Sequence, residues 1–436
     1  MFRFLTLLIS SVSMLAAQVV VLSHVRLIDG SGAAPVEDAT IVMAEGKIRE
    51  IGPSANVKIP SGAEVRELRD KTVVPGIINL HGHVGNVKGI ETGRELFTRE
   101  NVLRNLGTYA KYGVTTTTSM GTDEDLMIEI RDDIRQGRER TTRVFTALQG
   151  FTSRQGYPTQ APGVKGVAQE VFSAAQSRAW VDGLADKHAD VVKMWVDSHH
   201  GEFNKLSPSL YGAIIAQAHK RGLLAFAHVY ELADAKGLVD AGIDVLAHSV
   251  RDQEVDAELI SKMKEKGTFY IPTMARELTT FAYAESPAWL DDPFFLEDAD
   301  PAAVEGVKTT IKAAQSDPKL IAQGKSDLAM AMKNVKKLWD AGVNVAFGTD
   351  TGPAGRFPGY LEHMEAKLMI EAGLTPAQVI EAWSKRCSEA LRIDKEFGTL
   401  AKGKAADLVV LDADPLADIL NTRKIHAVYI AGAKIN

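Results

Sequence analysis

The feature that most restricts the fold of this chain is a repeated alternation of short apolar segments and amphipathic helices. Between most of the apolar segments, apolar residues recur at three- and four-residue spacing, as in SPSLYGAIIAQAHKRG and DAELISKMKEKG, and glycine closes the helix. No GxGxxG motif follows the first segment, which argues against an open doubly wound sheet. The alternation therefore predicts a (β/α)8 TIM barrel. Its strands are expected at TVVPGIINL, VTTTTSM, RVFTALQ, DVVKMWV, LLAFAHV, DVLAH, TFYIPTM and NVAFGTD.

The two ends of the chain have a different texture. Short alternating segments bounded by Gly, Pro, Asn and Asp occur near the start, as in ATIVMAEGKIREIG, and return at the end in ADLVVLDADP and HAVYIAGAKI. Two β-rich ends that flank a long barrel are expected to pair with each other. We therefore predict a composite β-sandwich from residues 19–72 and 396–436, and a barrel over residues 73–395.

The first 18 residues form a separate segment. Arg3 precedes an uncharged apolar run that ends near Ala17, which is too short to span a bilayer but suits the core of a signal peptide. Leu15 fits a small-residue cleavage rule poorly, and a core strand or a misassigned start is the alternative. We predict a signal peptide over residues 1–18 and export to the periplasm or out of the cell. A cytoplasmic protein is the alternative to export.

Composition limits the partners and the kinds of site. The 436-residue chain has a net charge of −6 and no basic stripe, which argues against binding to nucleic acid or to anionic membranes. We expect a small-molecule substrate, no membrane contact after signal cleavage, and a homo-oligomer. Cys387 is the only cysteine, so a disulfide framework and a thiolate zinc site are both excluded. A metal site would have to use His, Asp, Glu or a modified residue.

Polar side chains stand at the ends of several predicted strands. Residues i and i+2 of a strand share a face, so the two histidines of the HGH motif can converge on one point. Active sites of TIM barrels lie at the carboxyl ends of their strands. Any one of these side chains could be a satisfied core residue, but their coincidence at equivalent strand ends favours a shared metal site. The candidates are His81, His83, Lys193, His228, His248 and Asp350.

Lys193 is the unusual member of this group. A cation among imidazoles that face a metal would be repelled, and burial favours the neutral amine. A neutral amine can take up carbon dioxide and become an anionic carbamate, which can bridge two metal ions. With this bridge, the donor set suffices for two divalent ions, which we expect to be Zn²⁺. A lysine held by a salt bridge to Asp350 is the alternative.

The motifs PGIINLHGH, DVVKMWVD, FAHVY, VLAHS and FGTDTG, with the tail GTLAKGKAADLVVLDADPLADI, resemble the amidohydrolase superfamily, in particular its imidazolonepropionase-like and prolidase-like members. The resemblance implies a barrel with a composite β-sandwich and a binuclear zinc centre. It also implies that His81, His83 and Asp350 hold the buried ion and that His228 and His248 hold the exposed one. Carboxylated Lys193 would bridge the two ions. Imidazolonepropionase itself and the mononuclear deaminases of the superfamily lack this lysine, so the binuclear hydrolases are favoured.

Such a site predicts hydrolysis of an amide or peptide-like C–N bond by a hydroxide that bridges the metal ions. Asp350 is the expected proton carrier. Tyr230, two residues after His228, is a candidate hydrogen-bond donor to the substrate, although packing at the barrel rim explains it equally well. The loop GFTSRQGYPTQAPG is expected to cover the site. The weaker candidates are the loop residues His199, His200, Arg251, Arg276 and Arg356, and His363, which is expected on a helix face.

The expected substrate is an N-acyl amino acid or a dipeptide, with its carboxylate held by an arginine or by Tyr230. Hydrolysis of a carbamate, a urea or a cyclic amide, and deamination, are alternatives on the same centre. A non-catalytic structural relative is the remote alternative. Loss of metal ligands would mark such a relative, and this sequence lacks none of them.

Overall fold

The computed structural model describes residues 19–159 and 164–435, and its main body is the predicted TIM barrel. The predicted signal peptide, residues 1–18, lies outside the described residues. Neighbouring barrel strands run parallel, and strands such as β13 and β14 are buried along their whole length, as expected where helices cover a parallel sheet. The barrel strands are Ile77–Gly82 (β6), Val114–Ser119 (β9), Arg143–Thr146 (β10), Val191–Val196 (β13), Leu224–Val229 (β14), Val245–Ala247 (β15), Phe269–Ile271 (β16) and Asn344–Val345 (β17).

The barrel wall consists of two hydrogen-bonded groups of strands. One group has the order β10-β9-β6, and the other runs from β13 to β17 in chain order. The Leu80 N–H donates to the Phe347 carbonyl at 3.0 Å, which joins β6 to the segment after β17. The Asp190 N–H donates to the Thr146 carbonyl at 2.8 Å, which joins the start of β13 to β10. These contacts bring the first and last strands together, so their carboxyl ends meet at one rim.

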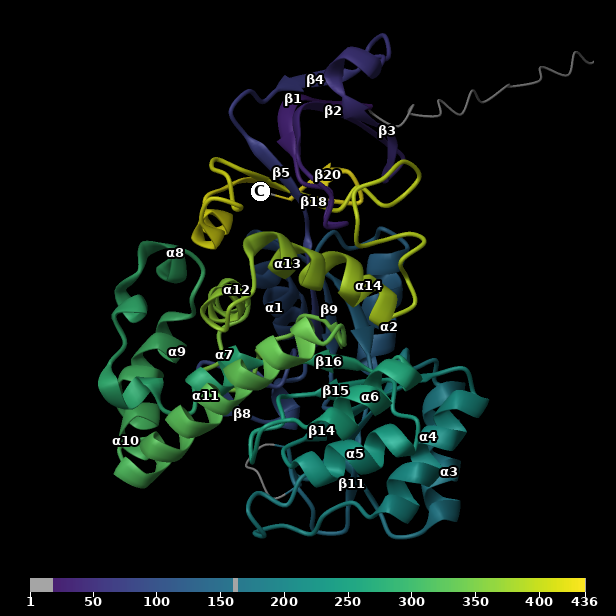
Figure 1. The fold of residues 1–436 in the computed structure, drawn as a ribbon, viewed down its shortest axis with the longest axis vertical. Helices are drawn as coiled ribbons and strands as arrows, with labels where there is room; N and C mark the ends of the chain where they lie inside the picture. The colour runs from purple at the N-terminus through teal and green to yellow at the C-terminus, as the bar shows by residue number, and fades with distance from the viewer. Residues whose placement is uncertain (1–18, 160–163, 436) are drawn as a thin grey trace, which may run out of the picture.

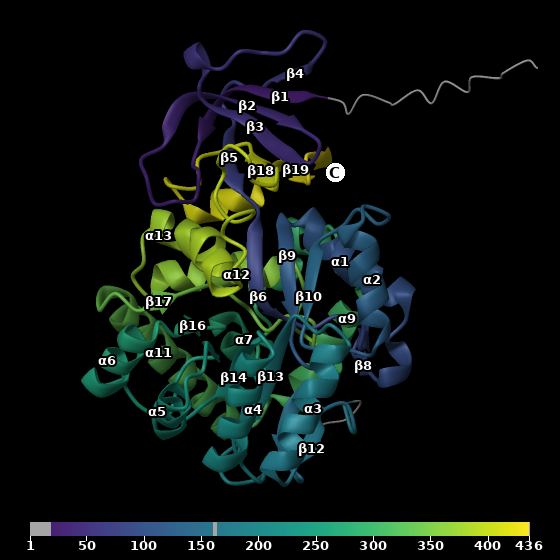
Figure 2. The ribbon, with the colours of Figure 1, turned by 90° about the vertical axis from the view of Figure 1, so that its right-hand side faces the viewer.

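Helices cover the outside of the barrel, and Figure 2 shows α3 and α4 over β13 and β14. The capping box predicted at Thr375 and Gln378 is present at the start of α13. The helices are Arg99–Lys111 (α1), Leu126–Arg135 (α2), Ala174–Asp186 (α3), Pro208–Lys220 (α4), Leu232–Asp240 (α5), Ala257–Lys266 (α6), Met274–Leu278 (α7), Pro293–Leu296 (α8), Pro301–Gly306 (α9), Lys312–Ala314 (α10), Pro318–Asp340 (α11), Tyr360–Glu371 (α12), Pro376–Glu381 (α13) and Cys387–Ala390 (α14).

Strands from both ends of the chain form one eight-stranded sheet above the barrel (Figure 1). The central pairing is between β5 from the N-terminal part and β18 from the C-terminal part, which run antiparallel. This sheet packs around a hydrophobic core of its own. Its strands are Val20–Leu27 (β1), Val36–Ala44 (β2), Lys47–Pro53 (β3), Glu64–Glu67 (β4), Thr72–Pro75 (β5), Leu408–Leu411 (β18), Ile425–Ile430 (β19) and Ala433–Lys434 (β20).

The sheet and the barrel are joined at Gly76, where β5 passes directly into β6. The predicted boundary between residues 72 and 73 therefore falls inside β5. His363, predicted on a helix face, belongs to α12, and its side chain is buried between the two parts. Its Nδ1 lies 2.9 Å from Thr422 Oγ1, and its Nε2 lies 2.9 Å from the Tyr112 carbonyl oxygen. These contacts connect the barrel helices to the segment before β19.

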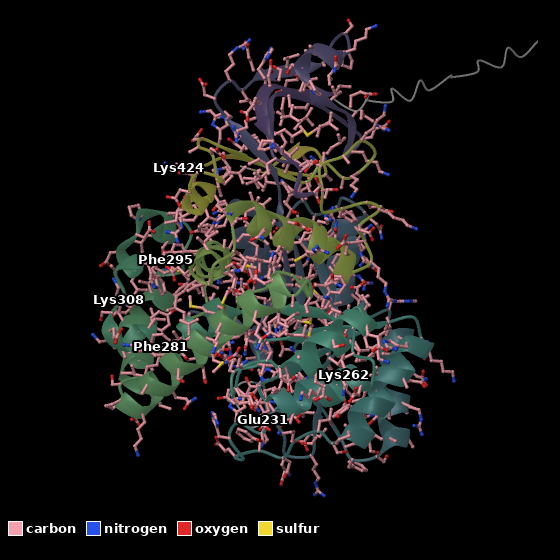
Figure 3. The ribbon with its side chains drawn as sticks, in the orientation of Figure 1. Glu231, Lys262, Phe281, Phe295, Lys308 and Lys424 are labelled. Carbon is pink, nitrogen blue, oxygen red and sulfur yellow. The ribbon has the colours of Figure 1, made fainter. Side chains whose placement is uncertain are left out.

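The helical segment α8–α11 packs on one flank of the barrel. Buried aromatic residues on this flank include Phe295 of α8 and Phe281, which follows α7, whereas Lys308 lies at the outer edge (Figure 3). The remaining strands are short: Val87–Lys88 (β7), Glu91–Thr92 (β8), Phe151–Ser153 (β11) and Gln169–Val171 (β12). Within residues 19–159 and 164–435, no helix combines the length and the apolar character needed to cross a membrane.

Candidate metal centre and active site

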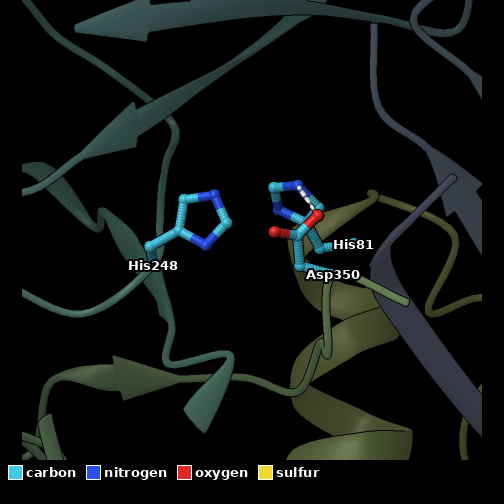
Figure 4. Close-up of side chains that lie close together, drawn as sticks. All are labelled: His81, His248 and Asp350. Carbon is cyan, nitrogen blue, oxygen red and sulfur yellow. Dashed lines mark ion pairs between the residues drawn. The ribbon is translucent and has the colours of Figure 1, made fainter. Parts of the chain in front are cut away.

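The six predicted metal ligands meet at the carboxyl rim of the barrel. His81 belongs to β6, Lys193 to β13 and His228 to β14, and the other three follow strand ends. Asp350 Oδ1 lies 3.0 Å from His83 Nε2 and 3.6 Å from His81 Nε2. Figure 4 shows His81 and Asp350 together, with His248 facing them across the site. The ring of His248 lies 4.6 Å from that of His81 and 4.3 Å from that of His228, measured between ring centroids.

Two of these residues adopt a backbone conformation that is rare for residues with side chains. His248 has a φ of 73° and Asp350 a φ of 58°, both in the left-handed region. Such conformations carry an energetic cost and persist where the surrounding structure enforces them, which is often at functional sites. The Asp350 N–H donates to the His81 carbonyl at 2.6 Å, so this turn fixes one candidate ligand against another.

Protein groups hold one ring nitrogen in three of the four imidazoles. His83 Nδ1 lies 3.0 Å from Thr122 Oγ1, and His248 Nδ1 lies 2.7 Å from Thr273 Oγ1. His228 Nε2 lies 2.8 Å from Asp197 Oδ2. The other nitrogen of each ring remains for a ligand role, and partners of this kind orient histidines at metal sites. The Nδ1 of His81 is buried and has no hydrogen-bond partner among the described residues.

The protonation states also suit a metal centre. Burial lowers the pKa of His81 and His248 far below the usual histidine value, and it lowers that of His228 to about 3. These rings are neutral near pH 7 and keep a lone pair for coordination. Burial opposes the charged form of Asp350, but the nearby Arg356 guanidinium holds the pKa of this carboxyl well below its usual range. Donor atoms of His81, His248 and Asp350 lie within 4.8 Å of one another, a donor set that fits a divalent ion such as Zn²⁺.

Lys193 is fully buried beside this cluster. Its Nζ lies 3.2 Å from His81 Nε2 and over the Trp195 ring, at 5.6 Å from the ring centroid. Among the described residues, Lys193 forms no ion pair with Asp350 or with another carboxylate within 4.0 Å. The structure therefore does not support the alternative of a salt-bridged lysine. Burial lowers the pKa of the Lys193 ammonium to about 7, and a substantial share of the amine is therefore neutral at physiological pH.

The ligands open into a cavity of about 200 Å³. Much of its wall is apolar or aromatic, and Arg356 is the arginine that lines it. The loop predicted to cover the site, residues 150–163, contributes Tyr157 and Pro158 to this wall, and Val164 directly after it also lines the cavity; residues 160–163 of the loop lie outside the described part. The apolar and aromatic wall residues are Val84, Val87, Tyr157, Pro158, Val164, Trp195 and Pro353.

Two of the weaker candidate arginines are occupied by other contacts. Arg251 Nη1 donates to the Ser249 carbonyl at 2.7 Å, and the Arg251 guanidinium stacks on the Tyr230 ring. Arg276 Nη1 donates to both carboxylate oxygens of Glu277, at 2.7 and 2.9 Å. Arg276 Nε also lies 3.7 Å from Asp350 Oδ2. Arg356 Nη1 contacts the same oxygen at 2.5 Å, and of the three arginines it is the one that lines the cavity.

Tyr230 does not line the cavity. Its hydroxyl donates to Asp327 Oδ1 at 3.1 Å, and burial raises its pKa. Its predicted contact with the substrate therefore stays a prediction that this geometry does not support. His200 packs against the edge of the Tyr230 ring, whereas His199 packs on Tyr157 at 4.0 Å between ring centroids. Of the two loop histidines, His199 is thus the one close to the cavity wall.

The site also contains four residues that the sequence pattern does not single out: Asp197, Thr122, Thr273 and Tyr157. Asp197 could have been found from the sequence. It lies four residues after Lys193 in DVVKMWVD, and in an extended segment it therefore projects from the same face as Lys193. The other three lie in loops or turns whose path has no comparable periodicity. Their positions come from the folded barrel rim.

A carboxylate lies behind the metal ligands. Glu362 of α12 is fully buried, and its Oε1 accepts hydrogen bonds from Asn79 Nδ2, Thr349 Oγ1 and Thr351 Oγ1, each at 2.7 Å. Asn79 Oδ1 in turn accepts the His81 N–H at 3.0 Å. Burial raises the pKa of Glu362 from 4.5 to about 7, while the other carboxyl oxygen has no partner among the described residues.

We expect Glu362 to make the stability of the folded protein depend on pH. Because the folded-state pKa is raised, the contribution of Glu362 to the free energy of unfolding is fully present below about pH 4.5. Up to about 3 kcal/mol of this free energy is lost as the pH rises through 7. Glu362→Gln retains a neutral amide and should remove this loss. In metal-free protein, the urea midpoint of the variant should rise relative to wild type between about pH 5 and about pH 8. Glu371→Gln, an exposed change on the same helix, is the control. Parallel pH profiles for wild type and Glu362→Gln would contradict this assignment.

Comparisons with known proteins agree with this architecture. The sequence profile of the Amidohydrolase family matches residues 72–435. An imidazolonepropionase of Mycolicibacterium smegmatis is 23% identical over 387 residues, which cover 88% of this chain and 87% of that protein. The ochratoxinase of Aspergillus niger is 28% identical over 219 residues, which cover 50% of this chain but only 38% of the ochratoxinase. The crystal structure of a Xaa-Pro dipeptidase with methionine bound in its active site matches with a TM-score of 0.76 and 22% identity, and covers 96% of this chain and 99% of the other.

Proposed function

The chain belongs to the amidohydrolase family, and from this premise we propose that it is a metal-dependent hydrolase of carbon–nitrogen bonds. The observation that carries the proposal is the convergence of four imidazoles and Asp350 on the wall of one cavity, with the buried Lys193 in contact with His81. No pair of these residues would be decisive alone. Together they supply nitrogen and oxygen donors for two divalent ions.

In this proposal, His81, His83 and Asp350 hold one ion, and His228 and His248 hold the second. When bound, the two ions supply an activated water and polarise the scissile carbonyl. Lys193 would supply a further anionic ligand once its neutral amine has attacked the carbon of CO₂. A new N–C bond forms, the electrons of one C–O π bond become the charge on the carbamate oxygen, and the nitrogen gives up one proton to water. The buried position of Lys193 and its pKa near 7 support this step.

Asp350 is the proposed proton carrier. Its Oδ1 faces the two histidines of β6 and the following turn, and its Oδ2 faces Arg356. Because Arg356 keeps the carboxyl ionised, Asp350 can accept a proton from the attacking water at neutral pH. It can then deliver that proton to the leaving nitrogen, so the amine departs uncharged. The apolar wall of the cavity limits the access of other water molecules to the reacting bond.

The proposed substrate has an apolar group beside its amide bond and a free carboxylate, as in an N-acyl amino acid or a dipeptide. The aromatic and aliphatic wall of the cavity suits the apolar group, and Arg356 is placed to pair with the carboxylate. The similarity in fold to a Xaa-Pro dipeptidase supports this choice of substrate. Tyr230 is left out because its hydroxyl is bound to Asp327. Carbamates, ureas, cyclic amides and deamination remain the alternatives for a substrate panel, and export and self-association remain predictions.

Metal analysis tests the centre directly. Purified protein, dialysed against metal-free buffer, should retain about two divalent ions per chain, since the donor set exceeds what one tetrahedral zinc ion uses. Elemental analysis by mass spectrometry gives the number of ions. Chelation should abolish hydrolysis, and Zn²⁺ or Co²⁺ should restore it. A reproducible content of one ion per chain, with full activity, would contradict the binuclear site.

A second prediction tests the role of Arg356. Converting the substrate carboxylate to an amide should lower kcat/KM by about 100-fold, because a charge-assisted contact in the cavity is lost. In Arg356→Gln, the difference between the acid and the amide should shrink, although overall turnover also falls because Asp350 loses its partner. Kinetics of both substrates with both proteins separate these effects. Faster cleavage of neutral ureas, carbamates or lactones than of any amide with a carboxylate would reject this substrate assignment.

A further inference from the structure

Asp197 is a buried carboxylate that the proposed reaction does not use. It directly follows β13, and only 6% of its surface is exposed. Its Oδ2 lies 2.8 Å from His228 Nε2, and its Oδ1 accepts the backbone N–H of His199 at 2.7 Å. We propose that Asp197 is a positioning residue that fixes the orientation and tautomer of His228 and thereby strengthens binding of the second metal ion.

The strand register explains why these two side chains meet. In the parallel pair β13–β14, Trp195 lies opposite His228. Asp197 lies two residues beyond Trp195 on the same face, so it is the diagonal neighbour of His228. The following turn at His199 and His200, both with positive φ, ends the extended segment immediately after Asp197. The carboxylate is therefore held at the strand end rather than on a free loop.

The chemistry of the contact determines the tautomer of His228. A carboxylate can only accept a hydrogen bond, so His228 must carry its proton on Nε2. A neutral ring then has its lone pair on Nδ1, which is the nitrogen left for the metal. A carboxylate behind a ligating histidine also makes the imidazole a stronger donor. Asp197 thus selects the ligand atom and raises its affinity.

The charges of the two proposed ion sites give Asp197 a specific role. The first ion has the anionic ligand Asp350, whereas His228 and His248 are both neutral. His83 and His248 contact threonine hydroxyls, but His228 contacts an anion. Besides the proposed carbamate, Asp197 is therefore the carboxylate that places negative charge next to the second ion. Removal of the Asp197 carboxylate should therefore weaken the binding of the second ion and leave the binding of the first unchanged.

A competing interpretation is an additional metal site at Asp197, His199 and His228, whose donor atoms lie within 4.8 Å of one another. The short distance of 2.8 Å between Asp197 Oδ2 and His228 Nε2 argues against it. Two ligands on a tetrahedral zinc ion, with bonds of about 2 Å, lie about 3.3 Å apart.

This inference rests on the proposed binuclear centre and can be tested by metal titration of the full chain. Metal-free wild type, Asp197→Asn and Asp197→Ala are titrated with Co²⁺, whose visible spectrum reports the ligand environment, and bound metal is counted. In both variants the first ion should bind as in wild type, while the dissociation constant of the second should rise about 10- to 100-fold. Asp327→Asn removes a different buried carboxylate, on α11, and should leave both constants unchanged.

A double-substitution cycle shows whether Asp197 acts through His228. In a His228→Ala background, Asp197→Asn should have no further effect on the second ion. Two ions of unchanged affinity and spectrum in Asp197→Asn would overturn the inference while leaving the proposed function intact. A third ion in wild type that is lost in His199→Ala would overturn it in favour of the additional site. Fewer than two ions in wild type would overturn both this inference and the binuclear centre.

Discussion

Replacement of Asp350 by Asn is expected to lower kcat by about 10⁴-fold on any substrate that the wild type hydrolyses. The amide cannot accept a proton from water at neutral pH, and it is a poorer metal ligand than a carboxylate. The backbone should not be disturbed, because Asn tolerates the left-handed conformation at this position. The measurement is kcat together with metal content for the same preparation.

Asp291→Asn is a suitable control, because Asp291 is an exposed carboxylate that pairs with Lys308 away from the cavity. This variant should have the kinetics of the wild type. If Asp350→Asn retained more than about one tenth of kcat with its full metal content, Asp350 could not be the proton carrier. The role would then belong to another group in the cavity.

Lys193→Ala is expected to remove one of the two ions and to lower turnover by about 10³-fold, since loss of the bridging anion costs several kcal/mol of transition-state stabilisation. Short carboxylic acids such as acetate or propionate should restore part of the activity, because they can occupy the place of the carbamate. Metal content and kcat, each measured with and without added acid, test both points. The surface variant Lys262→Ala on α6 serves as the control.

The carbamate can also be tested without mutation. Metal-free protein that is reconstituted in CO₂-depleted buffer should regain little activity until bicarbonate is added, because the neutral Lys193 amine lacks its reactant. Immediate full activity under CO₂-depleted conditions, or a fully active Lys193→Ala protein, would exclude the carbamate. An unmodified lysine would then face His81 as a hydrogen-bonding group.

The sequence was sufficient for the barrel and for the grouping of the metal-ligand candidates, because both depend on periodicity. The carboxyl ends of parallel strands meet at one rim, so polar residues placed there, such as His228 and Lys193, must come together wherever the strands are correctly located. The composite sheet was likewise predictable from the matching texture of the two chain ends. The boundary between this sheet and the barrel was less predictable, because β5 and β6 form a continuous path through Gly76.

The immediate surroundings of the ligands were not predictable to the same degree. Tyr230 follows His228 by two residues, yet its hydroxyl reaches Asp327 on α11, a contact between residues distant in sequence. The three loop arginines were equivalent in the sequence, and only their folded contacts distinguish Arg356 from Arg251. Tyr157 enters the cavity from a loop whose path no hydrophobic pattern specifies. These features depend on loop conformation and on long-range packing rather than on strand order.

The left-handed backbone at His248 and Asp350 also limits how this site can change during evolution. Glycine adopts such a conformation freely, and asparagine and aspartate tolerate it, whereas β-branched residues are strongly disfavoured. A lineage that abandons catalysis therefore cannot simply fill these two positions with the valine or isoleucine that a barrel interior would otherwise favour. Loss of the reaction by substitution at position 350 is most accessible through Asn or Gly, and a hydrophobic replacement there would first require the turn itself to be rebuilt.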